Sequence, residues 1–162
     1  MSKRELLVAP LGEAALILVV SIVGWATHQP LVFASLGPTA YEIIEKPSQP
    51  SARPYNVIVG HFIAVLAGFA ALFIVHAWSV PSVSASGVPF LRVWAAVVAA
   101  LITVFFTLLV KATQPAALST TLLVSLGIMQ TSWEAAMIMA GVVLIVAVGE
   151  PMRRLRQRAG KN

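Results

Sequence analysis

The chain has 162 residues, of which 59% are hydrophobic and only 10% are charged. An ordinary soluble domain carries roughly 25% charged residues, because its surface must be solvated, so this composition excludes a soluble globular protein. The net charge of +5 comes from the last eleven residues, Met152–Asn162, which hold five basic residues and no acid; the rest of the chain balances six basic residues against six acidic ones.

Long uncharged apolar runs predict the membrane-spanning elements. We expect four long helices, at about residues 10–27, 54–78, 89–110 and 132–150. A helix rises ~1.5 Å per residue, so 24 residues cover roughly 36 Å, enough for a hydrocarbon core of ~30 Å. The sequence therefore predicts an all-α integral membrane protein.

Proline divides the chain, because it suits the first turn of a helix and not its interior. Pro30 and Pro115 stand at the head of two shorter runs, at about residues 30–45 and 115–128. The sequence predicts a short Pro-initiated broken or half helix at each, ~20 Å long and too short to cross an undistorted bilayer. Pro38 falls inside the first short run, where we expect a kink or break.

The order long, short, long occurs twice, in a first repeat at about residues 10–78 and a second at about 89–150. Residues 26–30 (ATHQP) end the first long helix, and residues 112–115 (ATQP) end the third. The same residues recur at the same place in each half, which favours a true internal repeat.

Two topologies are open for the short helices. If both re-enter and leave on the same side, Lys46, Arg53 and Lys111 lie outside the cell and the other eight basic residues inside. If both cross, only Arg92 lies outside and ten basic residues lie inside. Because basic residues favour the cytoplasmic side, crossing is preferred. It makes the repeats inverted, an arrangement typical of transporters with a site near the midplane.

Polar residues gather at the two predicted breaks. One interpretation is structural: they satisfy broken backbone, which lipid cannot do, and join helices. The other is functional: helix N-termini at Pro30 and Pro115 point free N–H groups and positive dipole ends toward a cavity, which favours a small anion. The two interpretations are compatible. The candidate pathway residues are Thr27, His28, Gln29, Ser35, Thr39, Asn56, His61, Thr113, Gln114, Ser119 and Thr120.

Other ionisable residues are assigned from their positions in the runs. Arg53 and Lys111 are the cations nearest the breaks, where they either attract an anion or extend to the interface. His61, early in the second long helix, is either a hydrogen-bonded structural residue or a substrate or proton site. Glu42 and Glu45 are expected to end the first short helix at the surface. The chain lacks hydrolase, metal-site and phosphate-loop motifs, so we expect neither enzymatic activity nor a cofactor.

Three stretches carry a family resemblance. Residues 36–40 (LGPTA) are followed by residues 47–61 (PSQPSARPYNVIVGH), and Gln114-Pro115-Ala116 comes later. Together they resemble the HPP family of small integral membrane proteins, with its Pro-x-x-Pro-x-x-x-Pro-x-Asn-x-x-x-Gly-His block and its later His-Pro-Pro motif. The resemblance covers about residues 10–150. Gln114 stands where the family has histidine, so a neutral hydrogen-bonding role is implied there.

The resemblance also implies a function. The family is described as having four transmembrane helices, and it includes plastid and cyanobacterial members implicated in nitrite transport. We therefore expect a membrane transporter or channel for a small inorganic anion, with nitrite as the first candidate. The alternative is a non-transporting membrane scaffold or sensor subunit whose polar clusters are only structural.

The remaining expectations concern organisation and partners. Residues 1–152 are expected to form a single transmembrane domain, and residues 153–162 a basic cytoplasmic tail attracted to anionic lipid. A bacterial plasma (inner) membrane with both termini cytoplasmic is the expected location. Nucleic-acid binding is not expected, because it would need a basic folded face. Small residues on several helix faces favour a homo-oligomer, as a dimer or a trimer.

Overall fold

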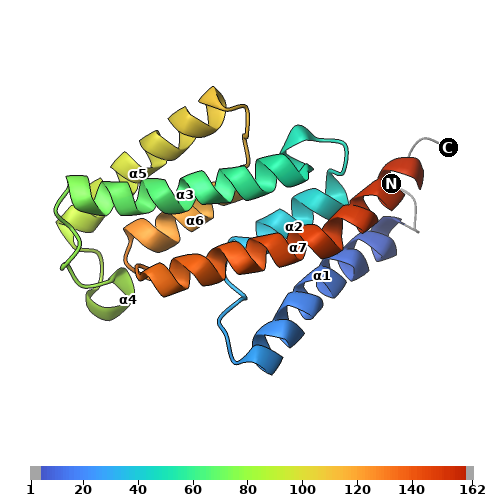
Figure 1. Ribbon diagram of the computed structural model, residues 1–162, viewed down its shortest axis with the longest axis horizontal. Helices are drawn as coiled ribbons and strands as arrows, with labels where there is room; N and C mark the ends of the chain where they lie inside the picture. Colours follow the sequence, from blue (N-terminus) through green and yellow to red (C-terminus); the bar gives the residue numbers. More distant parts are fainter. Residues whose placement is uncertain (1–4, 160–162) are drawn as a thin grey trace.

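The computed structural model describes residues 5–159, with side chains for residues 7–158. Within this part of the chain every regular element is a helix (Figure 1), which confirms the predicted all-α class. The helices are, in order, α1 (Glu5–Thr27), α2 (Leu36–Glu45), the 3-10 helix η1 (Pro50–Ala52), α3 (Pro54–Ile74), α4 (Val83–Ser86), α5 (Phe90–Leu109), α6 (Ala116–Ser125) and α7 (Ser132–Ala159).

Four of these helices, α1, α3, α5 and α7, are long and apolar enough to cross a membrane. They are the four long helices predicted from the sequence. Three of them differ from the expected bounds: Pro10 lies inside α1, α3 ends at Ile74 and not near residue 78, and α7 continues through Pro151 into the basic tail. The Glu150 carboxylate lies 2.6 Å from Nε of both Arg153 and Arg154. These pairs support the helix across the point where proline removes a backbone bond.

The first short helix begins later than the sequence predicted. Residues 28–35 are not helical, and α2 starts at Leu36 with Pro38 in its first turn. The expectation that Pro30 starts the helix and that Pro38 breaks it is therefore wrong. The first-turn amides of a helix have no intrahelical acceptor, so proline costs nothing there. The second short helix does begin directly after Pro115, as predicted.

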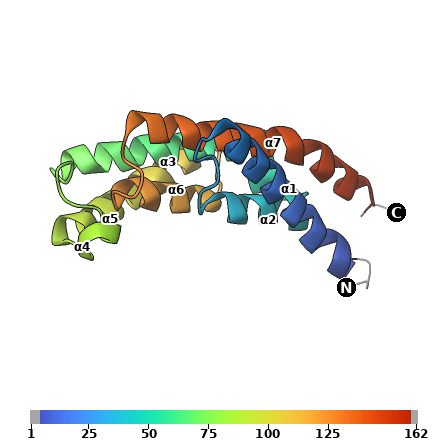
Figure 2. The same cartoon turned by 90° about the horizontal axis from the view of Figure 1, so that it is seen from below.

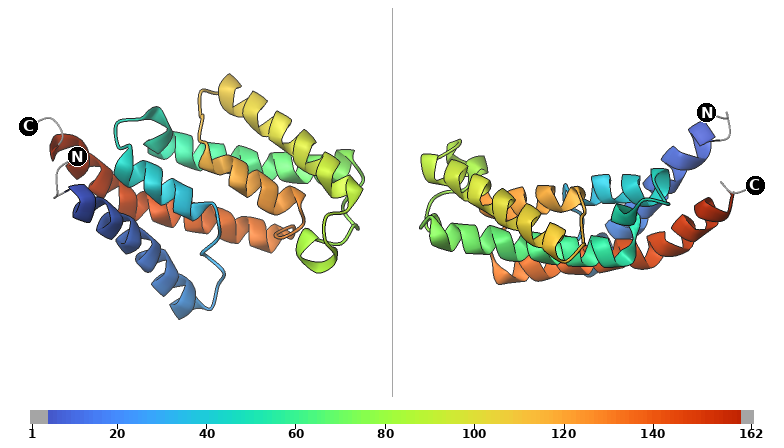
Figure 3. Two further views of the ribbon diagram at one scale, coloured as in Figure 1. Left: turned by 180° about the vertical axis from the view of Figure 1, so that it is seen from behind. Right: turned by 90° about the horizontal axis from the view of Figure 1, so that it is seen from above.

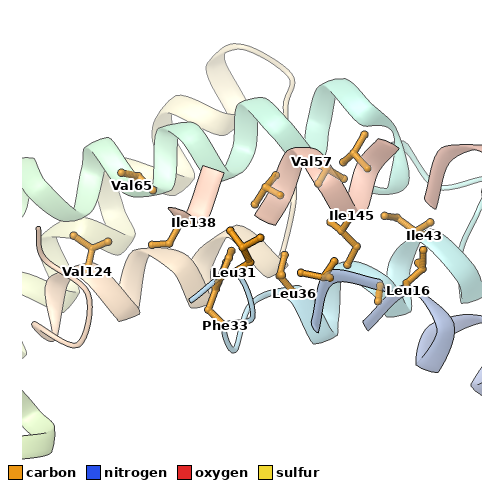
Figure 4. Packing of buried hydrophobic residues seen from close by; sticks show 14 of the residues in the cluster. Leu16, Leu31, Phe33, Leu36, Ile43, Val57, Val65, Val124, Ile138 and Ile145 are labelled. Atoms are coloured by element: carbon orange, nitrogen blue, oxygen red, sulfur yellow. The ribbon is translucent and has the colours of Figure 1, made fainter. Parts of the chain in front are cut away.

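Contact with α7 explains why the segment before α2 stays extended. Gly141 of α7 has no side chain, and a Cβ built there would lie 2.6 Å from the carbonyl oxygen of Leu31. Leu31 and Phe33 are buried, and they pack with Ile138 of α7 in the main apolar cluster (Figure 4). Burial of these apolar side chains fixes the segment against α7.

Each short helix packs against the first long helix of its own half of the chain and against the last long helix of the other half. The short helix α2 packs against α1 and α7, whereas the short helix α6 packs against α5 and α3. Contact between α3 and α7 joins the two groups. Figures 2 and 3 show α3 and α7 in one layer and the two short helices in the other, with the starts of α2 and α6 near the middle of the molecule.

Consecutive helices among α1, α2, α3, α5, α6 and α7 run in alternating directions (Figures 1 and 3). The start of α1, the α2–α3 connection and the end of α7 therefore lie at one end of the molecule, and α4 lies at the other. An inverted repeat requires this order of directions. However, Ala26–Thr27 end helix α1, whereas Ala112–Thr113 follow the end of α5, so the repeat itself stays a prediction.

A buried arginine holds the end of the molecule that contains α4. The Arg92 side chain of α5 is fully buried and has no carboxylate partner in the described part of the chain. Its guanidinium is instead surrounded by oxygen acceptors from the α3–α5 connection, the end of α6 and the residues before α7. These acceptors are the carbonyls of Val80, Pro81 and Ser125 and the side-chain oxygen of Gln130.

Replacing Arg92 by methionine should destabilise the fold by about 3 kcal/mol, because several buried acceptors then lose their donor. Arg154→Met, at an exposed position, is the control and should cost less than about 1 kcal/mol. Thermal unfolding in detergent micelles, followed by circular dichroism, measures both. Equal melting temperatures for the two variants would contradict the assigned role of Arg92.

The alternating directions also predict which connections share a side of the membrane. The chain has no cysteine, so single cysteines can be introduced at Ser48, Ser84 and Arg158, all exposed. We expect a membrane-impermeant maleimide to label positions 48 and 158 from the same side and position 84 from the opposite side. Re-entrant short helices require the reverse, with positions 84 and 158 sharing a side.

Candidate functional site

The start of α2 meets α6 beside a histidine of α3. His61 places Nε2 3.0 Å from Thr39 Oγ1 of α2 and Nδ1 2.7 Å from Thr120 Oγ1 of α6. The Ser35 hydroxyl, directly before α2, lies 2.7 Å from the same Thr120 oxygen. All four side chains are 0% exposed. We call Ser35, Thr39, His61 and Thr120 the His61 network; it links both short helices to α3.

The hydrogen-bond directions in the His61 network follow from one fixed donor. The Thr39 hydroxyl donates to the Ser35 carbonyl at 2.8 Å, so it accepts from the Nε2–H of His61. A neutral imidazole then accepts at Nδ1, so Thr120 donates to Nδ1 and Ser35 donates to Thr120. We therefore assign the neutral Nε2–H tautomer to His61, because it satisfies every bond without a charged partner.

Two glycines of α3 let α6 and the segment before it approach. A Cβ built at Gly60 would lie 2.8 Å from Gln114 Cβ, and one at Gly68 would lie 2.6 Å from Val124 Cβ. Ala64, between them on the same helix face, is fully buried. Small residues at four-residue spacing give α3 the flat face that close helix packing needs, and His61 lies at its edge.

Gln114 lies at the entrance to α6 and is only 3% exposed. Its Oε1 accepts from the Ala116 amide at 3.3 Å, while its Nε2 has no hydrogen-bond partner in the described part of the chain. The next two amides, of Ala117 and Leu118, bond to carbonyls one turn back. The first amides of α6 are therefore not free, and the donor available at this helix start is the Gln114 side chain.

Glu42 lies beside Gln114 and not at the surface. It is 8% exposed, and its Oε2 has no hydrogen-bond partner in the described residues. Ser51, Lys46 and Gln114 interact with its carboxyl. The expectation that Glu42 ends the short helix at the surface is wrong, because η1 and the start of α6 cover it. Glu45, in contrast, is partly exposed.

Asn56 has a structural place next to the His61 network. Its Nδ2 donates to the Thr113 carbonyl at 3.1 Å and to the Lys111 carbonyl at 3.4 Å. The neighbouring Tyr55 hydroxyl donates to the Val110 carbonyl at 3.0 Å. These bonds hold the segment between α5 and α6 against the start of α3, where a broken helix needs partners for its backbone.

The structure does not bring Thr27, His28 and Gln29 to the His61 network. Thr27 and His28 are exposed, and the Thr27 hydroxyl donates to a carbonyl of its own helix. His28 has φ 55° and the Gln29 amide bonds to the Gly24 carbonyl, which is a Schellman helix end. These residues terminate α1, and the extended segment that follows separates them from Ser35.

The remaining candidates lie around the network and not in it. Thr113, Arg53 and Lys111 are exposed, and Ser119 is partly buried. Lys111 has φ 55° and occupies the same position at the end of α5 as His28 does at the end of α1. The side chains of Arg53 and Lys111 therefore contribute to the surface, where the two cations flank the place at which the end of α5 meets the start of α3.

Sequence reasoning missed a second layer of hydroxyls. Thr103 Oγ1 of α5 lies 2.8 Å from Thr121 Oγ1 of α6, and both side chains are buried. Thr107, one turn later in α5, is buried and donates to the Thr103 carbonyl. The available signal was the four-residue spacing of Thr103 and Thr107, which puts both on one face of an otherwise apolar helix.

Comparison with known protein families matches the chain over almost its whole length. The model of the family described as HPP, transmembrane region, matches residues 1–160. No curated protein and no solved structure matches the chain. In the described part of the chain, no group of three or more His, Asp or Glu side chains is placed to hold a metal ion.

Thr120→Val should destabilise the protein by about 2 kcal/mol, because it leaves His61 Nδ1 and the Ser35 hydroxyl buried without their partner. Thr113→Val makes the same chemical change at an exposed position and should change stability by less than about 0.5 kcal/mol. Thermal unfolding of both variants in the same detergent measures the difference. A Thr120 variant as stable as the Thr113 variant would contradict the network.

Proposed function

We propose that the chain, which belongs to the HPP transmembrane family, moves a small inorganic anion across the membrane, with nitrite as the first candidate. One observation carries the proposal: two short helices of opposite direction begin near the middle of the bundle and meet at buried polar groups. Broken helices whose N-terminal ends converge on a site are a transporter architecture, and their positive dipole ends favour an anion.

Neutral donors would carry the anion through this region. The Gln114 amide is buried with Nε2 unpaired, and the hydroxyls of Ser35 and Thr120 lie further along the junction of α2 and α6. The His61 network is closed to solvent in the described conformation. Passage therefore requires α2 or α6 to move relative to α3, as expected when access alternates between the two sides.

The distribution of basic residues supports an orientation. Lys46 and Arg53 lie in the α2–α3 connection, and the bonds of Tyr55 and Asn56 place Lys111 at the same end as Arg53. Arg92 lies at the other end. By the positive-inside tendency, we assign the end that holds Lys46, Arg53 and Lys111, and with it both termini, to the cytoplasmic side of a bacterial inner membrane. Arg53 and Lys111 would then raise the anion concentration at the cytoplasmic mouth.

Two partners follow from the exposed surfaces. The described arginines of the α7 extension, apart from the buried Arg153, are exposed or partly exposed, and they suit an anionic lipid surface. Helix α5 leaves most of its apolar side chains exposed, including Leu101 and Phe105. Lipid would cover that face, together with a second copy of the chain if a dimer or trimer forms.

A membrane scaffold or sensor subunit is the second candidate. The observation that favours it is that the His61 network satisfies its own hydrogen bonds and is fully buried, as expected of polar groups that only join helices. This candidate predicts no anion flux.

The test measures flux of isotopically labelled nitrite in proteoliposomes, with protein-free vesicles of the same lipid setting the background. We expect the wild-type protein and Thr113→Val to exceed the background several-fold. The double variant Gln114→Leu/Thr120→Val should fall to background, because two neutral donors are removed from the pathway. Wild-type flux equal to that of protein-free vesicles would reject transport in favour of the scaffold.

A further inference from the structure

A buried carboxyl group with one unpaired oxygen stands next to the proposed pathway. Glu42 is more than nine-tenths buried, and its Oε2 has no hydrogen-bond partner in the described residues. It lies one turn beyond Thr39 on the buried side of α2, so it continues the row of polar side chains that begins at Ser35. Natural proteins rarely leave such a group unpaired.

An unpartnered donor lies beside this unpartnered acceptor. Gln114 is 3% exposed, and its Nε2 also has no partner in the described part of the chain. The Glu42 carboxyl interacts with the Gln114 side chain, while Glu42 Oε2 and Gln114 Nε2 each lack a hydrogen-bond partner in the described residues. One buried acceptor and one buried donor therefore border the same place between α2 and the start of α6. A proton on the carboxyl and an anion on the amide would satisfy both.

The charges around Glu42 do not neutralise it. Lys46, directly after α2, is the charged residue that acts on its carboxyl, and the Lys46 ammonium lies 5.6 Å from the centre of the Tyr41 ring. The element η1 presents the Ser51 hydroxyl, and the α5–α6 connection presents the Gln114 amide. Among the described residues Glu42 has no ion pair.

The charged residues of α1 and α7 that face α2 are occupied elsewhere. Arg156 of α7 lies 3.8 Å from Glu45, and Glu13 of α1 is also near Glu45. Arg153 of α7 pairs with Glu150 at 2.6 Å. The Thr120 hydroxyl, which faces α2 from α6, is neutral, and so is the His61 imidazole of α3 in the tautomer assigned above.

We propose that Glu42 couples the anion to a proton: the anion occupies the place beside Gln114 Nε2 when the Glu42 carboxyl is protonated. This inference rests on the proposed function and names its co-transported ion. An ionised carboxylate beside the amide would repel an anion strongly in a medium of low dielectric constant. A protonated carboxyl removes that repulsion and adds an O–H donor.

The coupling consists of one proton transfer. A carboxylate oxygen of Glu42 takes a proton from a hydronium ion of the solvent at the end of the molecule where Ser51 and Lys46 lie: one O–H bond of the hydronium breaks, an O–H bond on Glu42 forms, and a water molecule is left. The proton leaves by the reverse step after the anion has been released, and the anion itself is chemically unchanged. Because a buried carboxylate without an ion partner favours its neutral form, proton and anion enter together. One proton accompanies each monovalent anion, so transport is electroneutral.

The experiment asks which gradient drives nitrite accumulation in proteoliposomes. In the wild-type protein, an inward proton gradient of one pH unit should accumulate nitrite about tenfold, and a membrane potential set with potassium and valinomycin should have no effect. Glu42→Gln, which imitates the protonated carboxyl, should respond to the potential and no longer to the proton gradient. Glu45→Gln, one turn away, is the matched control and should behave as wild type.

Protein-free vesicles correct for leakage of nitrous acid, and the outcomes separate the two proposals. If Glu42→Gln still follows the proton gradient as wild type does, proton coupling through Glu42 is overturned while transport stands. If the wild-type protein gives no flux above leakage, the proposed function fails and this inference fails with it.

A measurement on the wild-type protein alone covers the case in which the Glu42 variant does not fold. Nitrite added to the purified protein in weakly buffered detergent solution should bind with uptake of about one proton per bound anion at a pH where the carboxyl starts ionised. Binding of nitrite without proton uptake across the range from acid to alkaline solution overturns the coupling. A pH electrode measures the proton uptake and the bound isotope measures the bound nitrite, both on the same sample.

Discussion

The hydrogen bonds of His61 are the interaction on which the centre of the molecule depends. Two short helices begin inside an apolar bundle, where lipid offers their ends no partners. His61 uses both ring nitrogens, one toward α2 and one toward α6, and so fixes the start of α2 and the middle of α6 relative to α3. Ser35 shows the cost of this arrangement: it stands at the N-cap of α2, yet its hydroxyl bonds to Thr120 of α6 and makes no cap. Tertiary contact has replaced the local capping bond that serine usually forms there.

The sequence predicted those elements whose cause is local. Hydropathy and length identify the four long helices, and proline marks the starts of α3 and α6, because a first-turn proline loses no backbone bond. The same rule failed at Pro30, since the segment after it packs across Gly141 of α7, more than a hundred residues away in the chain. The bond between His61 and Thr120 joins residues 59 positions apart, so no periodicity could reveal it. Glu42 was misplaced for the same reason: its cover comes from η1 and Gln114, not from its own helix.

Helix termination accounts for the other difference between the expected and the observed site. His28, His76 and Lys111 all adopt φ 55° at the ends of α1, α3 and α5. The amide of the residue after each of them bonds to a carbonyl five residues earlier and closes the helix. A left-handed conformation is costly for a residue with a Cβ, so these positions are set by the need to reverse the chain sharply. His28 lies at a turn, so its imidazole is exposed, whereas His61 lies within a helix and its imidazole is buried. Two histidines that look equivalent in the apolar runs thus have different roles: His28 forms the turn that ends α1, and His61 joins the two short helices to α3.

The two ends of the molecule differ in how their buried ionisable side chain is paired, and this difference bears on how the proposed pathway would open. Arg92 ties the α3–α5 connection and the end of α6 to α5 through several acceptors, and Gly127 leaves the space for its guanidinium. Motion there would separate a buried cation from its oxygen ligands, which is expensive. At the other end, Glu42 Oε2 and Gln114 Nε2 are unpaired, so displacement of α2 from the start of α6 would admit water to both atoms. If the protein transports an anion, the end that holds Glu42 is therefore the cheaper one to open, and the Arg92 end is the fixed point against which α2 moves.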